Sequence, residues 1–311
     1  MTKKISIVVV IPTHNRLTLF QRTLDSVLAC EPPIGKNVRL IVVENGGQFG
    51  VEKQIKKNKS WLTPEYLYVK DGNKSAALNA VVDSLDNELI VFLDDDVRVE
   101  PHLLQQYAEA ADDNPNGCFF GGPFAVDYVE KPPNWLLGYL PTSAKGWEPV
   151  QYEPIAPGAL WFIGFNWAAY AVDIKRASGF NPEVGPGAKS GATGQETTMQ
   201  QALVKNGIAP VYLPNARVWH YVPKSRCSPD WALERAFKSG VTIGMTMDRD
   251  APNGVLFGLP RWMLRKRLKL SWKLLKARFI ASRQEAFRVR YNLARFRGKM
   301  RGARKLFKNR H

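Results

Sequence analysis

The chain has 311 residues and a mass of 35.0 kDa; 45% of its residues are hydrophobic and 23% are charged. It can therefore bury a core, which excludes a wholly disordered protein, and its length suits one large domain or two smaller ones. Residues 1–260 carry 25 Lys and Arg against 27 Asp and Glu, a net charge of −2, whereas residues 261–311 carry 19 against one, a net charge of +18. The total of +16 thus belongs to a C-terminal segment. This distribution disfavours a globular nucleic-acid-binding domain.

The first 111 residues alternate between apolar runs and amphipathic segments. Residues 5–11 form a continuous apolar run, typical of a strand buried on both faces, which ends at Pro12 without the cleavage site of a signal peptide. Further strands are predicted at 38–43, 66–69 and 88–93, and helices at 17–30, 75–85 and 101–111. Strands separated by helices predict an α/β protein with a largely parallel sheet.

The cysteines and the apolar stretches bear on the location of the protein. Cys30, Cys118 and Cys227 are far apart and form no CxxC pair, so they favour a reducing compartment over a disulfide framework or a zinc site. The longest apolar stretch, 159–172, contains Asn166 and is shorter than the roughly 20 residues of a membrane span. We therefore expect a cytoplasmic protein without a transmembrane helix.

Polar residues follow three of the predicted strands directly. They are Pro12, Thr13 and Arg16 after the first strand, Glu44 and Asn45 after the second, and Asp94, Asp95 and Asp96 after the strand at 88–93. Parallel α/β sheets bind ligands beyond the carboxyl ends of their strands, so these clusters predict a site at one edge of the sheet.

The three consecutive aspartates are the strongest local signal. Adjacent carboxylates repel one another, and a divalent cation with a preference for oxygen ligands, Mg²⁺ or Mn²⁺, relieves that repulsion. The alternative is a solvated acidic turn that precedes the next helix. The buried strand before the triplet, and its alignment with the other two clusters, favour the metal site.

These segments together resemble a known family. VVVIPTHNR, VVENGG, NKSAALNAVVDSL and FLDDDVRVEP look, in this order, like the nucleotide-sugar half of a family 2 glycosyltransferase. GFNWAAYAVDIKRASG, GATGQETTMQQAL and VWHYV look like its acceptor half, so the resemblance covers about residues 5–220. It implies a GT-A (Rossmann-like) fold with a mostly parallel sheet flanked by helices, a nucleotide-diphosphate sugar donor, Mn²⁺ or Mg²⁺, and inversion at the anomeric carbon. The implied parts are a donor half at 1–115, an acceptor half of the same domain at 116–228 and a helical extension at 229–311, strongly basic from 261.

The resemblance also assigns donor and metal residues by position. The donor-binding residues it implies are Pro12, Thr13, Arg16, Glu44, Asn45, Lys74, Asp94 and Asp95. Glu44 stands where the family usually has Asp, and its carboxylate can accept from the imide N–H of uracil, so a UDP-sugar is expected. The implied metal ligands are Asp96, Asp94 and His220. For His220 the alternative is a hydrogen-bonded core histidine.

The acceptor half should supply a general base. The family pattern Gly-Glu-Asp appears here as Gly194-Gln195-Glu196, so the resemblance places Glu196 at the base position, with a side chain one methylene longer. The alternative is that Glu196 only favours the first turn of a helix at 197–205 through the helix dipole.

The acceptor is expected to be a saccharide or a lipid-linked saccharide in polysaccharide or glycoconjugate synthesis. Sugar rings stack on aromatic side chains, so Trp161, Trp167 and the neighbouring Asn166 are the acceptor candidates. Two other functions compete with the transferase. One is a sugar nucleotidyltransferase, although PTHNR is not its Gly-rich loop; the other is a degenerate scaffold that only binds saccharides.

The basic C-terminal segment carries two apolar patterns of helical spacing. They are Leu268, Trp272, Leu275 and Phe279, and Val289, Leu293, Phe296 and Met300. A basic amphipathic helix with aromatic residues is typical of a protein that binds an anionic membrane surface, so the pattern predicts a peripheral membrane protein. Packing on the protein itself and an oligomer are the main alternatives. Nucleic-acid binding by the segment is the least favoured, and we expect no nucleic-acid partner.

Overall fold

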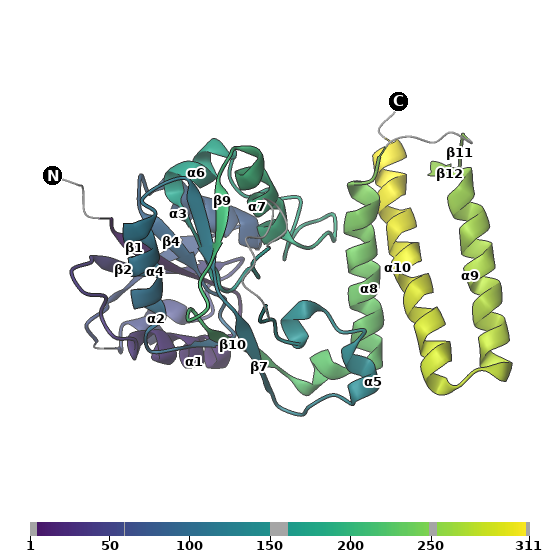
Figure 1. Cartoon of the computed structure of the whole chain (residues 1–311), viewed down its shortest axis with the longest axis horizontal. Helices are drawn as coiled ribbons and strands as arrows, with labels where there is room; N and C mark the ends of the chain where they lie inside the picture. The colour runs from purple at the N-terminus through teal and green to yellow at the C-terminus, as the bar shows by residue number, and fades with distance from the viewer. Residues whose placement is uncertain (1–4, 59, 150–160, 249–253, 309–311) are drawn as a thin grey trace. The chain divides into compact units, whose positions relative to one another are not determined.

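The computed structural model describes residues 5–58, 60–149, 161–248 and 254–308. The chain divides into two compact units (Figure 1). The α/β unit contains residues up to 127 together with 146–189 and 194–221, and the helical unit contains 128–145, 190–193 and 222–311.

A seven-stranded sheet in the order β3-β2-β1-β4-β8-β6-β9 forms the centre of the α/β unit. All neighbouring strands are parallel except β8, which is antiparallel to β4 and β6. The strands are β1 Ile7–Thr13, β2 Val38–Asn45, β3 Pro64–Val69, β4 Leu89–Phe92, β6 Cys118–Gly121, β8 Trp167–Tyr170 and β9 Ala209–Tyr212. A second sheet, β5-β10-β7, consists of Val97–Val99, Val218–Val222 and Phe124–Tyr128. The prediction of a mostly parallel α/β sheet is confirmed.

Helices cover both faces of the large sheet, which explains the apolar runs of its central strands. Ile7, Val9 and Ile11 of β1 belong to a core formed with α1, α2 and α4, whereas Val8 and Val10 belong to a second core formed with α3, α6 and α7. The helices are α1 Leu17–Leu28, α2 Val51–Ile55, α3 Lys74–Asp83, α4 Leu103–Asp113, α6 Ala171–Arg176 and α7 Gln195–Lys205. A strand buried on both faces has no polar alternation, as its sequence indicates.

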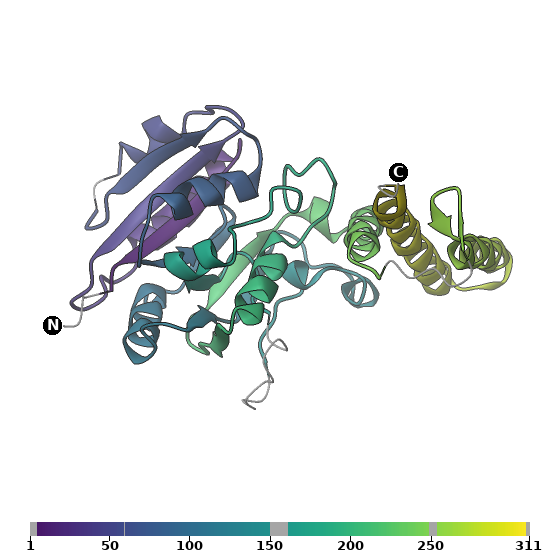
Figure 2. The same cartoon turned by 90° about the horizontal axis from the view of Figure 1, so that it is seen from above.

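Three long helices dominate the helical unit. They are α8 Pro229–Met245, α9 Arg261–Ile280 and α10 Arg283–Lys308, accompanied by the short α5 Asn134–Leu137 and the small hairpin β11 Val255–Leu256 and β12 Leu259–Pro260. Helix α10 lies between α8 and α9 (Figures 1 and 2). Within the described ranges, no helix combines the length and the apolar character needed to cross a bilayer.

Glycines allow the backbones of α8 and α10 to approach closely. A Cβ atom added at Gly240 or Gly244 of α8 would lie 2.0 or 2.1 Å from a carbonyl oxygen of α10. A Cβ added at Gly298 or Gly302 of α10 would lie 1.9 or 2.1 Å from a carbonyl oxygen of α8. The two helices therefore pack through reciprocal pairs of glycines, four residues apart in each helix.

Candidate active site

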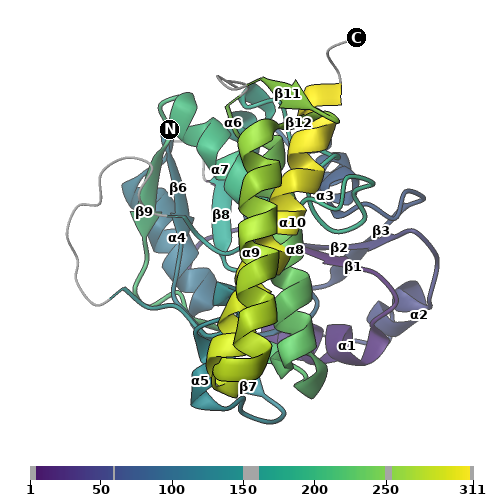
Figure 3. The ribbon, with the colours of Figure 1, turned by 90° about the vertical axis from the view of Figure 1, so that its right-hand side faces the viewer.

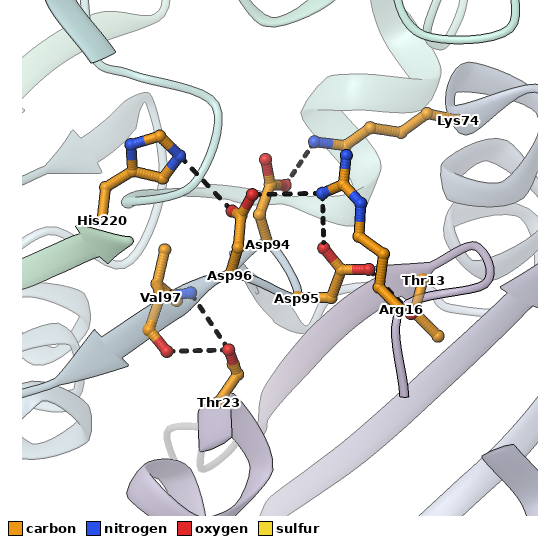
Figure 4. Close-up of polar contacts among 9 residues, drawn as sticks. All are labelled: Thr13, Arg16, Thr23, Lys74, Asp94, Asp95, Asp96, Val97 and His220. Carbon is orange, nitrogen blue, oxygen red and sulfur yellow. Dashed lines mark hydrogen bonds and ion pairs between the residues drawn. The ribbon is translucent and has the colours of Figure 1, made fainter. Parts of the chain in front are cut away.

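The polar residues that follow β1 and β4 meet at the carboxyl edge of the large sheet. Thr13 is the last residue of β1, and the three aspartates follow Leu93 just beyond the end of β4, which pairs with β1 in parallel. Figure 4 shows the side chains of Arg16, Lys74 and His220 pointing toward these aspartates from three separate elements of the chain. The sequence clusters at these two strand ends thus lie side by side at one edge of the sheet.

Asp95 is buried and is held from the β1 side of the site. The Thr13 hydroxyl donates a hydrogen bond of 2.7 Å to Asp95 Oδ2, and Arg16 Nη1 lies 3.1 Å from both Asp95 Oδ1 and Asp96 Oδ2. Burial, with a smaller contribution from the charges of Asp96 and Asp94, raises the pKa of Asp95 from its ordinary 3.8 to about 6. The Arg16 charge and the Thr13 hydrogen bond oppose this rise without cancelling it.

This raised pKa predicts that Asp95 makes the metal-free protein less stable as the pH rises. The native carboxyl keeps its proton up to about pH 6, whereas the unfolded one loses it near 3.8, so the stabilisation present below about pH 4 is lost through pH 6. We expect the wild type to lose up to about 3 kcal/mol of unfolding free energy over this interval relative to Asp95→Asn. Urea unfolding at several pH values, with a chelator present, measures the difference. Parallel pH profiles for the two proteins would contradict the prediction.

Lys74 approaches the aspartates from the start of α3. Asn73 precedes the helix and caps it, its side chain accepting a hydrogen bond from the Ala76 N–H, so the first turn is fixed in position. The Lys74 ammonium donates to Asp94 Oδ1. Burial lowers the pKa of Lys74, but the charges of Asp94, Glu196 and Asp96 raise it above its ordinary value. Lys74 therefore remains a cation among these carboxylates.

His220 closes the site from the second sheet. Its strand, β10, pairs with β5, and its Nε2 lies 3.5 Å from Asp96 Oδ1. The ring stacks on Phe165, with centroids 4.6 Å apart and an interplanar angle of 11°, and the N–H of Tyr221 donates to the Asp96 carbonyl oxygen. His220 is thus buried like a core histidine. It also faces Asp96, the carboxylate with which the family resemblance groups it as a metal ligand.

The residues at this edge fit a divalent cation that shares its coordination with a substrate. Oxygens of Asp95 and Asp96 already converge on the single nitrogen Nη1 of Arg16, so the carboxylates can share one cationic group. Within the described residues, no group of three His, Cys, Asp or Glu side chains is arranged to hold a metal ion by itself. Mg²⁺ commonly binds through one or two carboxylates together with substrate phosphates, and the protein's share of such a donor set, one or two carboxylates, is present at this edge.

Glu196 lies in the first turn of α7 and reaches the same region. Gly194 precedes the helix with a φ of +93°, a left-handed conformation that favours glycine. A Cβ atom added at Gly164 would lie 3.2 Å from Glu196 Cδ, so the carboxyl group packs against this glycine. Because the Glu196 charge also raises the pKa of Lys74, the expected base and the donor-side lysine lie in one electrostatic environment.

The structure corrects the acceptor contacts expected for Asn166 and Trp167. Both side chains are buried. Asn166 Nδ2 donates to the carbonyl oxygens of Pro123 and Ala216, and its Oδ1 accepts from the Tyr107 hydroxyl. Trp167 stacks on Phe92 with centroids 4.6 Å apart. These two residues are core elements with no surface for a sugar, whereas the half-buried Trp161 remains a candidate.

The donor contacts expected on the β2 side also change. Glu44 has no exposed surface; one carboxylate oxygen accepts from the Phe49 N–H and the other from the Tyr66 hydroxyl. In this structure its carboxylate organises the loop after β2 and presents no exposed surface to a nucleotide base. Pro12 and Asn45 are buried within β1 and β2, so they shape the edge without exposed side chains.

Sequence reasoning missed several residues that support the site. The Thr23 hydroxyl donates to the Val97 carbonyl oxygen and accepts from its N–H, which fixes the chain just after Asp96. A cavity of about 40 Å³ borders Thr23 and Asp96. The segment 180–187 is hydrogen-bonded to the start of α3. Asn73 Nδ2 donates to the Pro182 carbonyl oxygen, and the Lys74 N–H donates to the Pro186 carbonyl oxygen. Only the glycines of this segment give a sequence signal for its close packing on α3.

Comparisons with known proteins agree with this architecture. The chain is 27% identical over 246 residues to the succinoglycan biosynthesis protein ExoM of Rhizobium meliloti (strain 1021), covering 77% of this chain and 74% of that protein. It is 22% identical over 249 residues to a glucosyl-dolichyl phosphate glucuronosyltransferase of Haloferax volcanii, covering 76% and 75% of the two chains.

A solved structure shows the fold. The mannosyltransferase PcManGT of Pyrobaculum calidifontis, determined in complex with GDP-Man and Mn²⁺, superposes with a TM-score of 0.57 at 17% identity, over 100% of this chain and 89% of that chain. The GT-A fold is thereby confirmed. The profile of glycosyl transferase family 2 matches residues 8–172, more than half of the 311 residues. The matched region includes the aspartate triplet and strand β8, which pairs with β4. Because the profile covers more than half of the chain, the chain belongs to glycosyl transferase family 2.

Proposed function

We propose that this glycosyltransferase moves a sugar from a nucleotide-diphosphate donor to a hydroxyl of a saccharide or lipid-linked saccharide, with inversion, in polysaccharide or glycoconjugate synthesis. The observation that carries the proposal is the grouping of Asp94, Asp95 and Asp96 with Arg16, Lys74 and His220 at the carboxyl edge of the sheet. Relatives support it: ExoM acts in succinoglycan biosynthesis, and PcManGT was solved with GDP-Man.

Arg16 and Lys74 are the groups we assign to the donor diphosphate. Each is a cation that the aspartates hold at the site, Arg16 partly exposed and Lys74 nearly enclosed. A diphosphate brings negative charge that both can bind, and the Arg guanidinium suits phosphate oxygens in particular. The UDP preference has lost the support of Glu44 and remains a proposal; TarS of S. aureus, which superposes with a TM-score of 0.50 at 14% identity, was solved with UDP-GlcNAc.

We assign Asp96, Asp94 and His220 to Mn²⁺ or Mg²⁺. Carboxylate oxygens suit both ions, and His220 Nε2, 3.5 Å from Asp96 Oδ1, would add a nitrogen ligand. When bound, the ion supplies neutralisation of the charge that develops on the departing diphosphate. The presence of Mn²⁺ in the PcManGT complex supports the assignment.

Glu196 is the group we assign to the acceptor proton. The acceptor oxygen forms a bond to the anomeric carbon while the bond from that carbon to the diphosphate breaks and its electron pair leaves with the diphosphate. The hydroxyl proton passes to the Glu196 carboxylate, which is the role of a general base. One displacement of this kind inverts the anomeric carbon. Trp161 is the remaining acceptor contact that we propose.

We further propose a cytoplasmic location, with the basic segment 261–311 at an anionic membrane surface. The net charge of +18 in this segment supports the proposal, since anionic lipids attract clustered Lys and Arg.

A donor panel tests the function. UDP- and GDP-sugars are incubated with saccharide and lipid-linked acceptors, with Mn²⁺, Mg²⁺ or a chelator, and the released nucleoside diphosphate is measured. We expect release that requires a divalent cation, and in Asp96→Asn we expect cation-dependent donor binding to weaken about ten-fold or more. Asp113→Asn, an exposed carboxylate at the end of α4, is the matched control.

Two outcomes would contradict the proposal. A nucleotidyltransferase would release pyrophosphate from a nucleoside triphosphate and a sugar phosphate, and would not need an acceptor hydroxyl. A saccharide-binding scaffold would bind without turnover with any donor. Undiminished donor binding by Asp96→Asn would remove the metal assignment alone.

A further inference from the structure

Helix α9 exposes large apolar side chains along one face. Leu268, Trp272, Leu275 and Phe279 are 71%, 60%, 45% and 81% exposed. At 3.6 residues per turn they fall within an arc of about 60°, so they form one continuous stripe. On the other side of the helix, Met263 packs in a buried cluster with residues of α10.

The similar pattern in α10 has a different fate. Leu293, Phe296 and Met300 are buried, Phe296 and Met300 in the cluster that also contains Met263 of α9. Figure 3 shows α9 in front of α10 and α8 in this view. The apolar face of α10 is thus largely buried within the helical unit, whereas the α9 stripe (Leu268, Trp272, Leu275 and Phe279) faces solvent. Single exposed apolar residues are ordinary, but four in one row are typical of an interaction surface.

The charges of α9 indicate what would cover this stripe. The helix contains eight Lys and Arg and no acidic residue. Arg265, Lys269 and Lys276 are exposed beside the stripe, and Lys276 Nζ lies 5.7 Å from the centre of the Trp272 ring. A cationic helix with Trp, Phe and Leu on one exposed face complements an anionic lipid surface, in both its charge and its apolar interior.

Other occupants complement the stripe less well. A second copy of α9 would bring eight like charges toward eight like charges, which disfavours a dimer through this face. A nucleic acid would neutralise the cations but leave four apolar side chains in water. An anionic bilayer satisfies both features at once.

We propose that α9 lies flat on an anionic bilayer, with Leu268, Trp272, Leu275 and Phe279 inserted below the headgroups and the flanking Lys and Arg at the phosphate level. Helix α10 supports α9 and does not insert. This assignment rests on the membrane location proposed above for residues 261–311 and is independent of the transferase chemistry. It gives the membrane contact to α9 alone, although α9 and α10 have similar sequence patterns.

Vesicle flotation of the full chain tests the proposal. The wild type is expected to float with phosphatidylcholine vesicles that contain phosphatidylglycerol, and to float less as salt is raised. Trp272→Ser combined with Phe279→Ser is expected to lower the partition coefficient about ten-fold or more, because two exposed side chains lose their insertion. Ile34→Ser, at an apolar residue 86% exposed in the α/β unit, is the matched control and should float like the wild type.

Three results would overturn the proposal. One is that the double variant and the wild type float to the same extent, with circular dichroism and thermal unfolding showing that both are folded. The wild type could remain with the unbound fraction. Light scattering could instead reveal a dimer that the double variant dissociates in the absence of vesicles, which would make the stripe a contact between copies of the chain.

Discussion

Replacing Glu196 by Gln is expected to lower the turnover number of the transferase about 10²- to 10⁴-fold while leaving donor affinity within a few-fold. General bases contribute rate factors of this size, and Gln keeps the shape of the side chain but cannot accept the proton. The side chain packs against Gly164 in the first turn of α7, so the amide should occupy the same place. Steady-state kinetics with the donor and acceptor found in the panel, with donor binding by calorimetry, measures both effects.

The pattern of variants around Glu196 separates a base from a structural carboxylate. Glu109→Gln, at an exposed glutamate of α4, is the matched control and should leave turnover unchanged. Glu196→Asp should retain part of the activity, since a carboxylate remains one methylene further from the acceptor. If Glu196→Gln weakened donor binding and left the turnover number unchanged, Glu196 would instead position the Lys74 side of the site. An unchanged turnover number together with unchanged donor affinity would remove any role for Glu196.

The positions of the residues expected on the donor side could be predicted because these residues follow strands that the sequence marks clearly. The apolar runs before Thr13 and Asp94 are typical of strands buried on both faces, and parallel pairing brings the ends of such strands together. The helix that begins at Lys74 was also expected, within one residue of its true start. His220 was harder, because its strand belongs to a different sheet, and only the family resemblance connected it with Asp96.

The acceptor side could not be predicted in the same way. Trp167 is the first residue of the antiparallel strand β8, and Asn166 comes directly before it. No local sequence pattern indicates that this strand lies between β4 and β6. An aromatic residue in a short apolar strand has the same sequence signature whether it faces a sugar or a core. Glu44 raises the same difficulty, because its two hydrogen-bond partners, Phe49 and Tyr66, are set by the tertiary structure.

The C-terminal helices show the same limit on a larger scale. Their apolar residues share one spacing, yet Leu293, Phe296 and Met300 of α10 are buried, whereas the four apolar residues of the α9 stripe are exposed. Periodicity identifies the apolar face of a helix but not the surface that covers it. A further signal was present in the sequence and was not used: the glycine pairs of α8 and α10, four residues apart, typical of helices whose backbones approach closely.

Replacing Gly244 by Ala is expected to destabilise the helical unit by about 2 kcal/mol or more. In an isolated helix this change would stabilise by about 1 kcal/mol, because Ala has the higher helix propensity. Here the added Cβ would lie 2.1 Å from the Lys299 carbonyl oxygen and 2.7 Å from the Ala303 nitrogen, and backbone atoms of a second helix cannot rotate away. The helices must separate, which costs the packing of their neighbours. Urea or thermal unfolding of the full chain measures the loss.

Gly138→Ala is the matched control, since it lies in the same unit, just after α5, with a φ of −61° and no atom within 4 Å of an added Cβ. We expect it to change stability by no more than about 0.5 kcal/mol. Equal effects of the two substitutions would show that the glycines of α8 are not in close contact with α10. A loss of stability confined to Gly244→Ala would mean that the helical unit depends on the close packing of α8 against α10. Unchanged donor binding by the same variant would mean that the nucleotide site proposed for the α/β unit does not depend on this packing.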